Sequence, residues 1–194
     1  MAAMAKVDRA PGLAWTDDGE AQKLLVDNPL ALLIGFLLDQ QVPMEWAFGA
    51  PYLLRQRLGG RLDPAEIAGM DPARLERAFT EKPPLHRYPN SMARRTQTLC
   101  RVIVDEYGGD PGKIWNGATA QEAARRIARL PGFSANKASV IIGVLGKQLG
   151  LKLEGWEQMS PSWFSLADVD SKEALEHYRG IKRAAKQAGK WPPV

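Results

Sequence analysis

The sequence predicts an all-α protein with the composition of an ordinary globular domain. Apolar residues recur at helical spacing along nearly the whole chain, and no stretch shows the alternating pattern of a β-strand. Of the 194 residues, 45% are hydrophobic and 25% are charged, which is not typical of a disordered or fibrous chain. This length suits one domain with a core, or two small lobes that share a cleft.

Capping residues mark where the expected helices begin. The stretch TAQE, Thr119 to Glu122, has the form of a capping box, in which the threonine hydroxyl and the glutamate carboxylate accept backbone N–H groups. It predicts a helix that runs to about Leu130. Further helix starts are predicted at Asp63-Pro64, at Asp71-Pro72, and at Asp170 with Glu173.

Two stretches predict helices that form the core. PLALLIGFLL, Pro29 to Leu38, is the most apolar run, and it has about half of the ~20 residues that a membrane-spanning helix needs. It therefore predicts a buried core helix. From Ser91 to Tyr107, apolar side chains fall on one helix face, and Arg94 and Arg95 fall away from it. Cys100 lies on the apolar face, so we expect a buried thiol without chemistry.

Composition excludes several classes of protein. A single cysteine excludes an internal disulfide framework, a four-cysteine zinc site and a four-cysteine iron–sulfur cluster, so no metal or other cofactor is expected. The N-terminal stretch MAAMAKVDRAPG lacks the apolar centre of a secretory signal, which favours a cytoplasmic location. A net charge of +4 and a pI near 9.3 are compatible with a polyanionic partner but do not identify one.

The stretch LPGFSANKAS, Leu130 to Ser139, places a very short turn between two expected helices. Gly132 lets the backbone of that turn come close to whatever it faces. The first N–H groups of the following helix lack helical partners and point outward with the positive end of the helix dipole, so such a turn can bind a phosphate. A Pro-Gly turn alone is more often structural, and its surroundings have to decide.

Three segments in order carry a resemblance to a known family. They are LLIGFLLDQQ (Leu32 to Gln41), NSMARRTQTLC (Asn90 to Cys100) and the hairpin stretch itself. Together they are similar to the helix-hairpin-helix DNA glycosylase superfamily, also called HhH-GPD, which includes the endonuclease III family. The chain also resembles a bacterial subgroup of that superfamily without an iron–sulfur cluster.

The resemblance implies a fold of two helical lobes with a DNA-binding cleft between them. Residues 30–149 would form a helical-barrel lobe that includes the hairpin at 130–139, and residues 1–29 with 150–194 would form the second lobe. Double-stranded DNA, expected to be damaged, would be bent in the cleft while one nucleotide is flipped into a pocket. A monomer associated with the nucleoid is expected.

The implied activity is that of a base-excision repair enzyme. A monofunctional glycosylase flips a damaged base and hydrolyses its N-glycosidic bond. The alternative is a non-catalytic protein on the same scaffold that binds DNA structures or lesions. A helical protein–protein adaptor is a third reading, in which the arginine face would be incidental.

The resemblance also implies residues that contact DNA. Gln41 matches the glutamine that fills the gap left by a flipped nucleotide, and Ser134 replaces the second glycine of the hairpin. Trp156 and Trp163 are candidates to stack on a flipped base, although core packing explains a tryptophan equally well. The remaining candidates for DNA or pocket contacts are Gln40, Gly132, Phe133, Asn136, Lys137, Arg94, Arg95, His86 and Tyr88.

Catalytic residues follow from an ungapped alignment on Leu-Pro-Gly. The family's lysine nucleophile falls on Asn136, and Lys137 comes one residue later, rotated by about 100° on the helix, so no lysine-based lyase step is expected. The catalytic acid falls on Glu154, where the family has an aspartate. Asp39 is the rival, because an acid at the end of a very apolar helix is costly to bury without a purpose or a partner. The choice between the two acids stays open.

Overall fold

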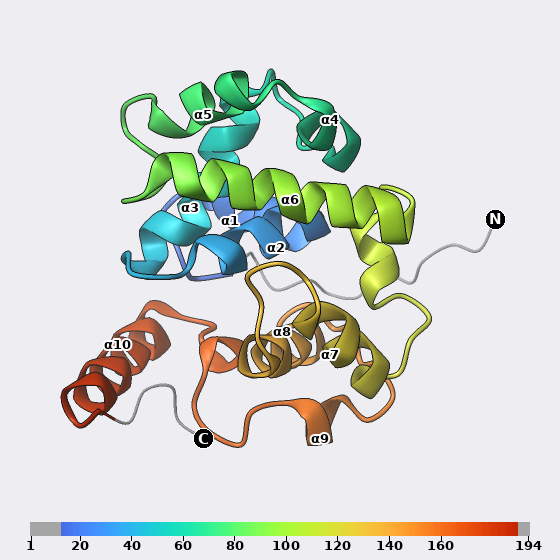
Figure 1. The fold of residues 1–194 in the computed structure, drawn as a ribbon. Coiled ribbons are helices and arrows are strands. Elements are labelled where there is room, and N and C mark those ends of the chain that lie inside the picture. Colours follow the sequence, from blue (N-terminus) through green and yellow to red (C-terminus); the bar gives the residue numbers. More distant parts are fainter. Residues whose placement is uncertain (1–12, 190–194) are drawn as a thin grey trace.

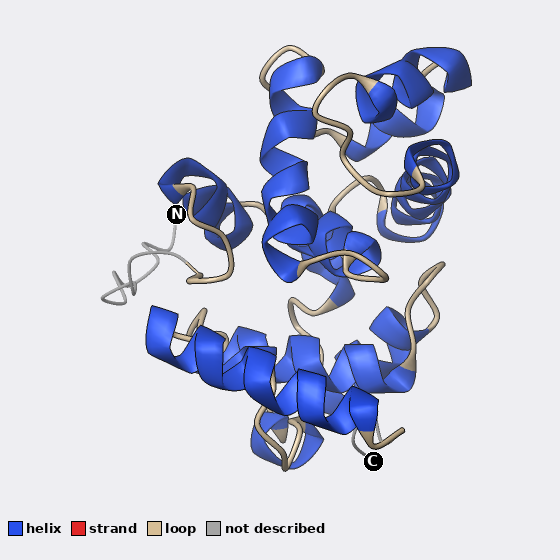
Figure 2. Ribbon diagram, turned by 90° about the vertical axis from the view of Figure 1, so that its left-hand side faces the viewer, coloured by secondary structure: helices blue, strands red, loops and turns tan. Residues whose placement is uncertain are grey.

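The protein is described by a computed structural model over residues 13–189, and every regular element in that range is helical, as predicted (Figures 1 and 2). Residues 1–12 and 190–194, which belong to the predicted second lobe, lie outside the described residues. The elements are α1 (Gly19–Asp27), α2 (Pro29–Leu38), α3 (Met44–Arg57), α4 (Pro64–Gly69), α5 (Pro72–Thr80), α6 (Pro89–Tyr107), η1 (Pro111–Ile114), α7 (Ala120–Ala128), α8 (Ala135–Lys147), α9 (Trp156–Met159), η2 (Leu166–Asp168) and α10 (Lys172–Gln187).

Helix α2 is the core helix that its composition predicts. Asn28 caps its N-terminus, and all residues from Leu30 to Leu38 are buried. The helix packs against α1 and α3, and the ring of Trp15 meets those of Phe36 and Phe48 at centroid distances of 5.8 and 4.6 Å. No described helix is by itself long and apolar enough to cross a membrane; α1 and α2 together have the required length and composition, with a bend of 113° between them.

In Figure 1, α1 to α6 form the upper half of the molecule, with α6 running across it. Helices α4 and α5 pack against α6, which begins at Pro89 and ends at Gly108 in the left-handed conformation. Cys100 on its inner face is fully buried, and burial raises the pKa of the thiol to about 12. The thiol therefore stays protonated, in agreement with a packing role.

Helices α7 and α8 form the predicted hairpin in the lower half of the molecule. Thr119 and Glu122 make the capping box that opens α7, with both of its reciprocal bonds present. Aspartates cap α4 and α5 as expected. The last helix departs by one residue from the prediction, because Ser171 and not Asp170 provides the cap of α10. A serine hydroxyl serves this position as well as a carboxylate does.

Several contacts cross the predicted lobe boundaries at 29/30 and 149/150. Helix α1 packs against α2 and α3, while α9 and η2 pack against α8. One bond joins the two parts of the predicted second lobe, because Trp15 Nε1 donates to the Val169 carbonyl at 3.2 Å. The described chain is therefore tied together across both boundaries.

Candidate functional site

A pocket of about 350 Å³ opens where α2 ends and α8 begins. The first and third of the segments that carry the family resemblance meet here, although about a hundred residues separate them in sequence. Polar side chains from these two segments line it: Asp39, Gln40, Gln41, Ser134, Asn136 and Lys137. Helix α10 closes the third side with Tyr178, Lys182 and Lys186.

The pocket is built on the C-terminal end of α2. The last carbonyls of a helix lack intrahelical partners, and here side chains supply them. Lys137 Nζ donates to the Phe36 carbonyl at 2.5 Å, and Gln40 Nε2 donates to the Leu37 carbonyl at 2.6 Å. This end of a helix carries partial negative charge, so it favours cations beside it.

Asp39 adds a full negative charge at the same place. It is the C-cap residue of α2, and its side chain is only 13% exposed. Its Oδ1 lies 3.8 Å from Lys182 Nζ on α10. The carboxylate thus sits between the end of α2 and the lysines that face it, and this ion pair gives the acid the partner that its burial demands.

Lys137 lies inside the pocket despite its one-residue offset from the family's lysine position. Both Asn136 and Lys137 line the pocket, because the first turn of α8 points its side chains along the end of α2. Burial lowers the pKa of the Lys137 amine, and the nearby Asp39 carboxylate opposes that shift. The ammonium also lies 5.6 Å from the centroid of the Phe133 ring.

The turn of the hairpin requires its glycine for two reasons. Gly132 has a φ of +86°, and a Cβ at this position would lie 2.5 Å from Cδ1 of Leu37. The turn therefore approaches α2 more closely than any other residue would allow. Ser134 caps α8, with its Oγ accepting from the Lys137 backbone N–H at 3.2 Å. Ser134, at the position of the family's second glycine, thus serves as the N-cap of α8.

A second hollow of about 260 Å³ lies on the other side of Gln40 and Gln41, lined also by His86, Tyr88 and Arg95. His86 is 1% exposed, and its Nδ1 accepts from the Tyr88 backbone N–H at 3.0 Å. Its Nε2 therefore carries the proton and donates to the Gln40 carbonyl at 2.9 Å. Burial lowers the pKa of the imidazole, with Arg95 contributing to the decrease, so the neutral ring is favoured.

The two glutamines form a ridge between the two hollows. Gln40 is held at both ends of its amide, because Arg95 Nη1 donates to its Oε1 at 3.1 Å while its Nε2 is bound to α2. Gln41 is exposed and has a φ of +58°, a conformation that costs about 1–2 kcal/mol for residues other than glycine. The backbone on either side holds Gln41 in a position that presents its side chain to solvent.

Five of the predicted site residues line neither hollow: Glu154, Trp156, Arg94, Gly132 and Phe133. Glu154 is exposed in the loop after α8, and its carbonyl accepts from the Ala120 N–H at the start of α7. Trp156 packs against Gly146 near the C-terminal end of α8. Arg94 pairs with Glu76 of α5 through a 2.8 Å contact. Trp163, the second stacking candidate, also contributes nothing to either hollow.

No residue of α10 was named as a site residue from the sequence, so the contribution of this helix was missed. Tyr178, Lys182 and Lys186 are spaced four residues apart and so share one side of the helix. That spacing was the available signal. It shows which side chains lie together, but not that this side would face Asp39.

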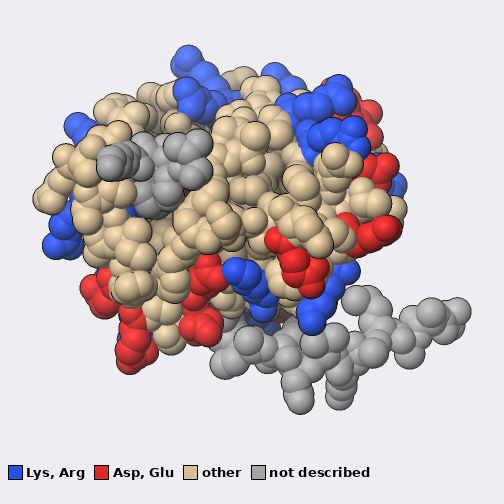
Figure 3. Space-filling model, turned by 90° about the horizontal axis from the view of Figure 1, so that it is seen from below, with Lys and Arg blue, Asp and Glu red and all other residues tan. Residues whose placement is uncertain are grey.

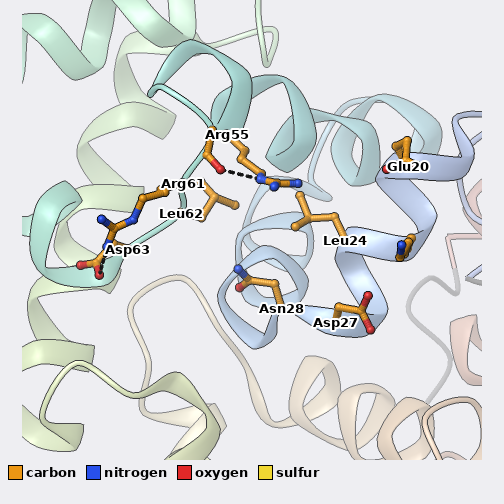
Figure 4. A pocket seen from close by; sticks show the side chains of 10 residues that line it. Glu20, Leu24, Asp27, Asn28, Arg55, Arg61, Leu62 and Asp63 are labelled. Atoms are coloured by element: carbon orange, nitrogen blue, oxygen red, sulfur yellow. Dashed lines mark hydrogen bonds and ion pairs between the residues drawn. The ribbon is translucent and has the colours of Figure 1, made fainter.

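Other charged regions of the described chain are less organised. Figure 4 shows a hollow between α1 and the loop after α3, where Arg61 pairs with Asp63 and Arg55 Nε donates to the Gly60 carbonyl. Two of its charged side chains are thus paired with each other, and a third is bonded to the backbone. On the face seen in Figure 3, basic and acidic side chains lie mainly around the rim of a largely uncharged centre and are interspersed along its lower edge. Within residues 13–189, no three His, Cys, Asp or Glu side chains gather into a group able to hold a metal ion.

Comparison with known proteins gives a distant similarity in structure only. No family model matches the sequence, and no curated protein matches it. A structure of a trapped covalent endonuclease III–DNA intermediate, an estranged-adenine complex, is 19% identical, with 82% of this chain and 73% of that chain covered at a TM-score of 0.44. A non-covalent endonuclease III–DNA complex is 20% identical, with 84% and 72% covered at a TM-score of 0.46. Similarity at this level does not establish a common activity.

Proposed function

We propose that the protein is a DNA glycosylase that flips a damaged base out of double-stranded DNA and hydrolyses its N-glycosidic bond. One observation carries the proposal: the three segments that resemble the HhH-GPD superfamily converge on one site. Lys137 of the hairpin segment is bonded to Phe36 of the first segment, and Arg95 of the second is bonded to Gln40. The enzyme is proposed to act as a monomer.

The charge distribution of the pocket suits cleavage of a glycosidic bond. As the bond between C1′ and the base nitrogen breaks, its electron pair leaves with the base and positive charge develops on the sugar. Asp39 and the C-terminal end of α2 place negative charge where the sugar would lie, and the Asp39 side chain is only 13% exposed, so its fixed charge stabilises such a state. A water oxygen then bonds to C1′ and gives its proton to the Asp39 carboxylate.

The Gln40–Gln41 ridge suits the mechanical step. A base inside a duplex is hidden from the enzyme, so it has to be extruded, and the gap has to be filled. Gln41 is the exposed residue of the ridge, directly beside the pocket. The bonds of His86 and Arg95 to Gln40 hold its neighbour in place. We assign the gap-filling role to Gln41.

The start of α8 and the pocket lysines supply contacts for the DNA backbone. Ser134, Asn136 and Lys137 at the start of α8 line the pocket, and Lys186 of α10, which also lines it, is exposed. Phosphate contacts of this kind release counterions, so binding has to weaken as salt rises. Affinity for duplex DNA that does not depend on salt would contradict the proposal.

We assign no covalent role to Lys137. A Schiff base requires a neutral amine that is free to attack C1′. Burial lowers the pKa of Lys137 and so favours the neutral amine, but its Nζ is bound to the Phe36 carbonyl and is not free to attack. The enzyme is therefore proposed to hydrolyse the bond and leave an intact abasic site.

The test is incubation with end-labelled duplexes, each holding one deaminated, oxidised or alkylated base, followed by analysis with and without alkali. Strand cleavage only after alkali is the expected result. Cleavage without alkali, with borohydride trapping that is lost in Lys137→Gln, would replace the monofunctional proposal by a lyase. Selective binding without any cleavage would favour the non-catalytic lesion-binding alternative.

A further inference from the structure

Helix α10 makes the pocket predominantly cationic. Among the described residues that line it, Lys137, Lys182 and Lys186 are basic and Asp39 is the one acid. Two of these three lysines come from α10, on the same side of the helix as Tyr178. Helix α10 lies outside the three segments that carry the family resemblance.

Lys182 is the lysine best placed to act on a bound base. Its side chain is 22% exposed, its Nζ lies 3.8 Å from Asp39 Oδ1 and 5.7 Å from the centroid of the Tyr178 ring. Lys137 is instead engaged with the end of α2. A sugar placed against Asp39 would therefore have its base directed toward α10 and the Lys182 ammonium.

Charge on the departing base separates two classes of damaged DNA. A deaminated or oxidised base is uncharged in DNA and leaves as an anion, because it takes the electron pair of the glycosidic bond. A base alkylated on a ring nitrogen is a cation in DNA and leaves uncharged. Only the first class needs a positive group beside the base. At an effective dielectric constant of about 20, a unit charge about 6 Å away changes an equilibrium by roughly a hundredfold.

We propose that this site accepts uncharged bases with exocyclic oxygens, deaminated or oxidised, and that the Lys182 ammonium stabilises the negative charge such a base carries as it leaves. This inference rests on the proposed glycosylase function. The base nitrogen receives the electron pair of the broken bond and then a proton from solvent, while Asp39 takes the proton of the attacking water. The same lysines repel a cationic alkylated base.

The experiment compares single-turnover release and equilibrium binding of duplexes that hold uracil, hypoxanthine or 8-oxoguanine with duplexes that hold 7-methylguanine or 3-methyladenine. We expect the protein to release the uncharged bases uracil, hypoxanthine or 8-oxoguanine, and to bind duplexes that hold them more tightly than duplexes that hold the cationic bases. Lys182→Gln should slow release of an uncharged base by roughly 10²-fold, which is typical for loss of one group that stabilises a developing anion. Faster release of the cationic bases would overturn the inference.

A leaving-group series distinguishes stabilisation of the base from a structural role of Lys182. The fastest-released uncharged base is compared with an analogue whose electron-withdrawing substituent stabilises the anion, 5-fluorouracil in the case of uracil. The loss in Lys182→Gln should shrink for the better leaving group, and Lys182→Arg should recover most of the rate. An equal loss for both bases would show that Lys182 acts only through the structure.

Lys172→Gln is the matched control, because Lys172 lies in the first turn of α10 and pairs only with the exposed Asp17. Its rates should equal those of the unmodified protein. If no base is released from any duplex, the glycosylase function fails, and the binding measurements still decide the charge preference. Tighter binding of the 7-methylguanine duplex would then refute that preference, and tighter binding of the uracil duplex would support it.

Discussion

The two ends of α8 differ in how they are packed and in what they offer for chemistry. At its N-terminal end, Asn136 and Lys137 face a solvent-accessible pocket that also holds Asp39. At its C-terminal end, Trp156 packs so closely that a Cβ on Gly146 would lie 2.2 Å from Cε3 of the indole. An alignment that counts residues from the hairpin assigns the catalytic acid to Glu154, beyond the C-terminal end of α8. The structure gathers the polar groups of the pocket at the N-terminal end of α8 instead.

The difference between the two ends shows why counting residues from a motif fails to locate a site residue once a loop intervenes. A helix of 13 residues carries its axis about 20 Å from one end to the other. Whether the chain after α8 returns to the hairpin or turns away is decided by the loop. Here Leu151 N–H donates to the Leu145 carbonyl and Ala120 N–H donates to the Glu154 carbonyl, so the loop stays at the far end.

The largest effect is expected for Asp39→Asn. Loss of the charge that faces the sugar should lower single-turnover release of the base by roughly 10³-fold, which corresponds to about 4 kcal/mol of transition-state stabilisation. DNA affinity should change little, because the amide retains the shape of the side chain. The measurements are quench kinetics and fluorescence anisotropy, with a thermal melt to verify folding. A loss below tenfold would remove Asp39 from the chemistry.

A pair of glycine substitutions compares the two ends directly. Gly132→Ala and Gly146→Ala should each destabilise the fold by about 1–3 kcal/mol, because an added Cβ meets Leu37 at 2.5 Å and the Trp156 indole at 2.2 Å, respectively. Gly132→Ala should also slow base release, since it moves the hairpin that bounds the pocket. Gly146→Ala should leave the rate per folded molecule unchanged. Urea unfolding and active-site titration measure both quantities, and equal losses of rate would contradict the separation of the two ends.

A smaller effect is expected from pH. The pKa of His86 is lower in the folded protein than its ordinary value of about 6.5, so the stability that the neutral ring contributes is present above pH 6.5 and is lost as the pH falls through the lowered pKa. The slope is at most about 1.4 kcal/mol per pH unit. Urea unfolding at several pH values between 7.5 and 5 should reveal this slope in the unmodified protein. In His86→Gln the contribution should be absent; an unchanged slope would assign it to other groups.

The smallest effect is expected for Glu154→Gln. Its side chain is exposed and does not line the pocket, so base release should stay within about twofold of the unmodified protein. The same assay used for Asp39→Asn supplies the comparison. If Glu154→Gln slowed base release by about 10²-fold and Asp39→Asn did not, Glu154 would be the catalytic acid, as the ungapped alignment has it. The loop after α8 would then have to move when DNA binds.

Most of the fold follows from local signals in the sequence. The capping box at Thr119, the aspartates before Pro64 and Pro72, and the uninterrupted apolar run of α2 each depend on neighbours within a few residues, and all were predicted. The start of α10 was displaced by one residue because Asp170 and Ser171 both have capping side chains.

Sequence motifs located the residues of the pocket only where the motif lies at the end of a helix. Gln40, Gln41 and the first residues of α8 line the pocket because they lie at helix ends, which sequence locates well, whereas Gly132 and Phe133 of the same hairpin do not line it. The roles of Lys182 and of Glu154 depend on the paths of the loops after α8 and η2, which no local pattern encodes. Asp39 stood as an alternative because an acid at the end of an apolar helix needs a partner, and the partner is Lys182.

The bond between Lys137 and the Phe36 carbonyl has a consequence for synthesis. It joins residues 101 positions apart, and Trp15 reaches Val169 across 154 positions. Domains form as the chain leaves the ribosome, N-terminal part first. The helices that hold Asp39 and the glutamine ridge emerge early, yet the pocket is not complete until α10 has followed them. A polypeptide interrupted before α10 would carry the Gln40–Gln41 ridge without Lys182 and Lys186, so synthesis through α10 is a condition for the pocket to exist.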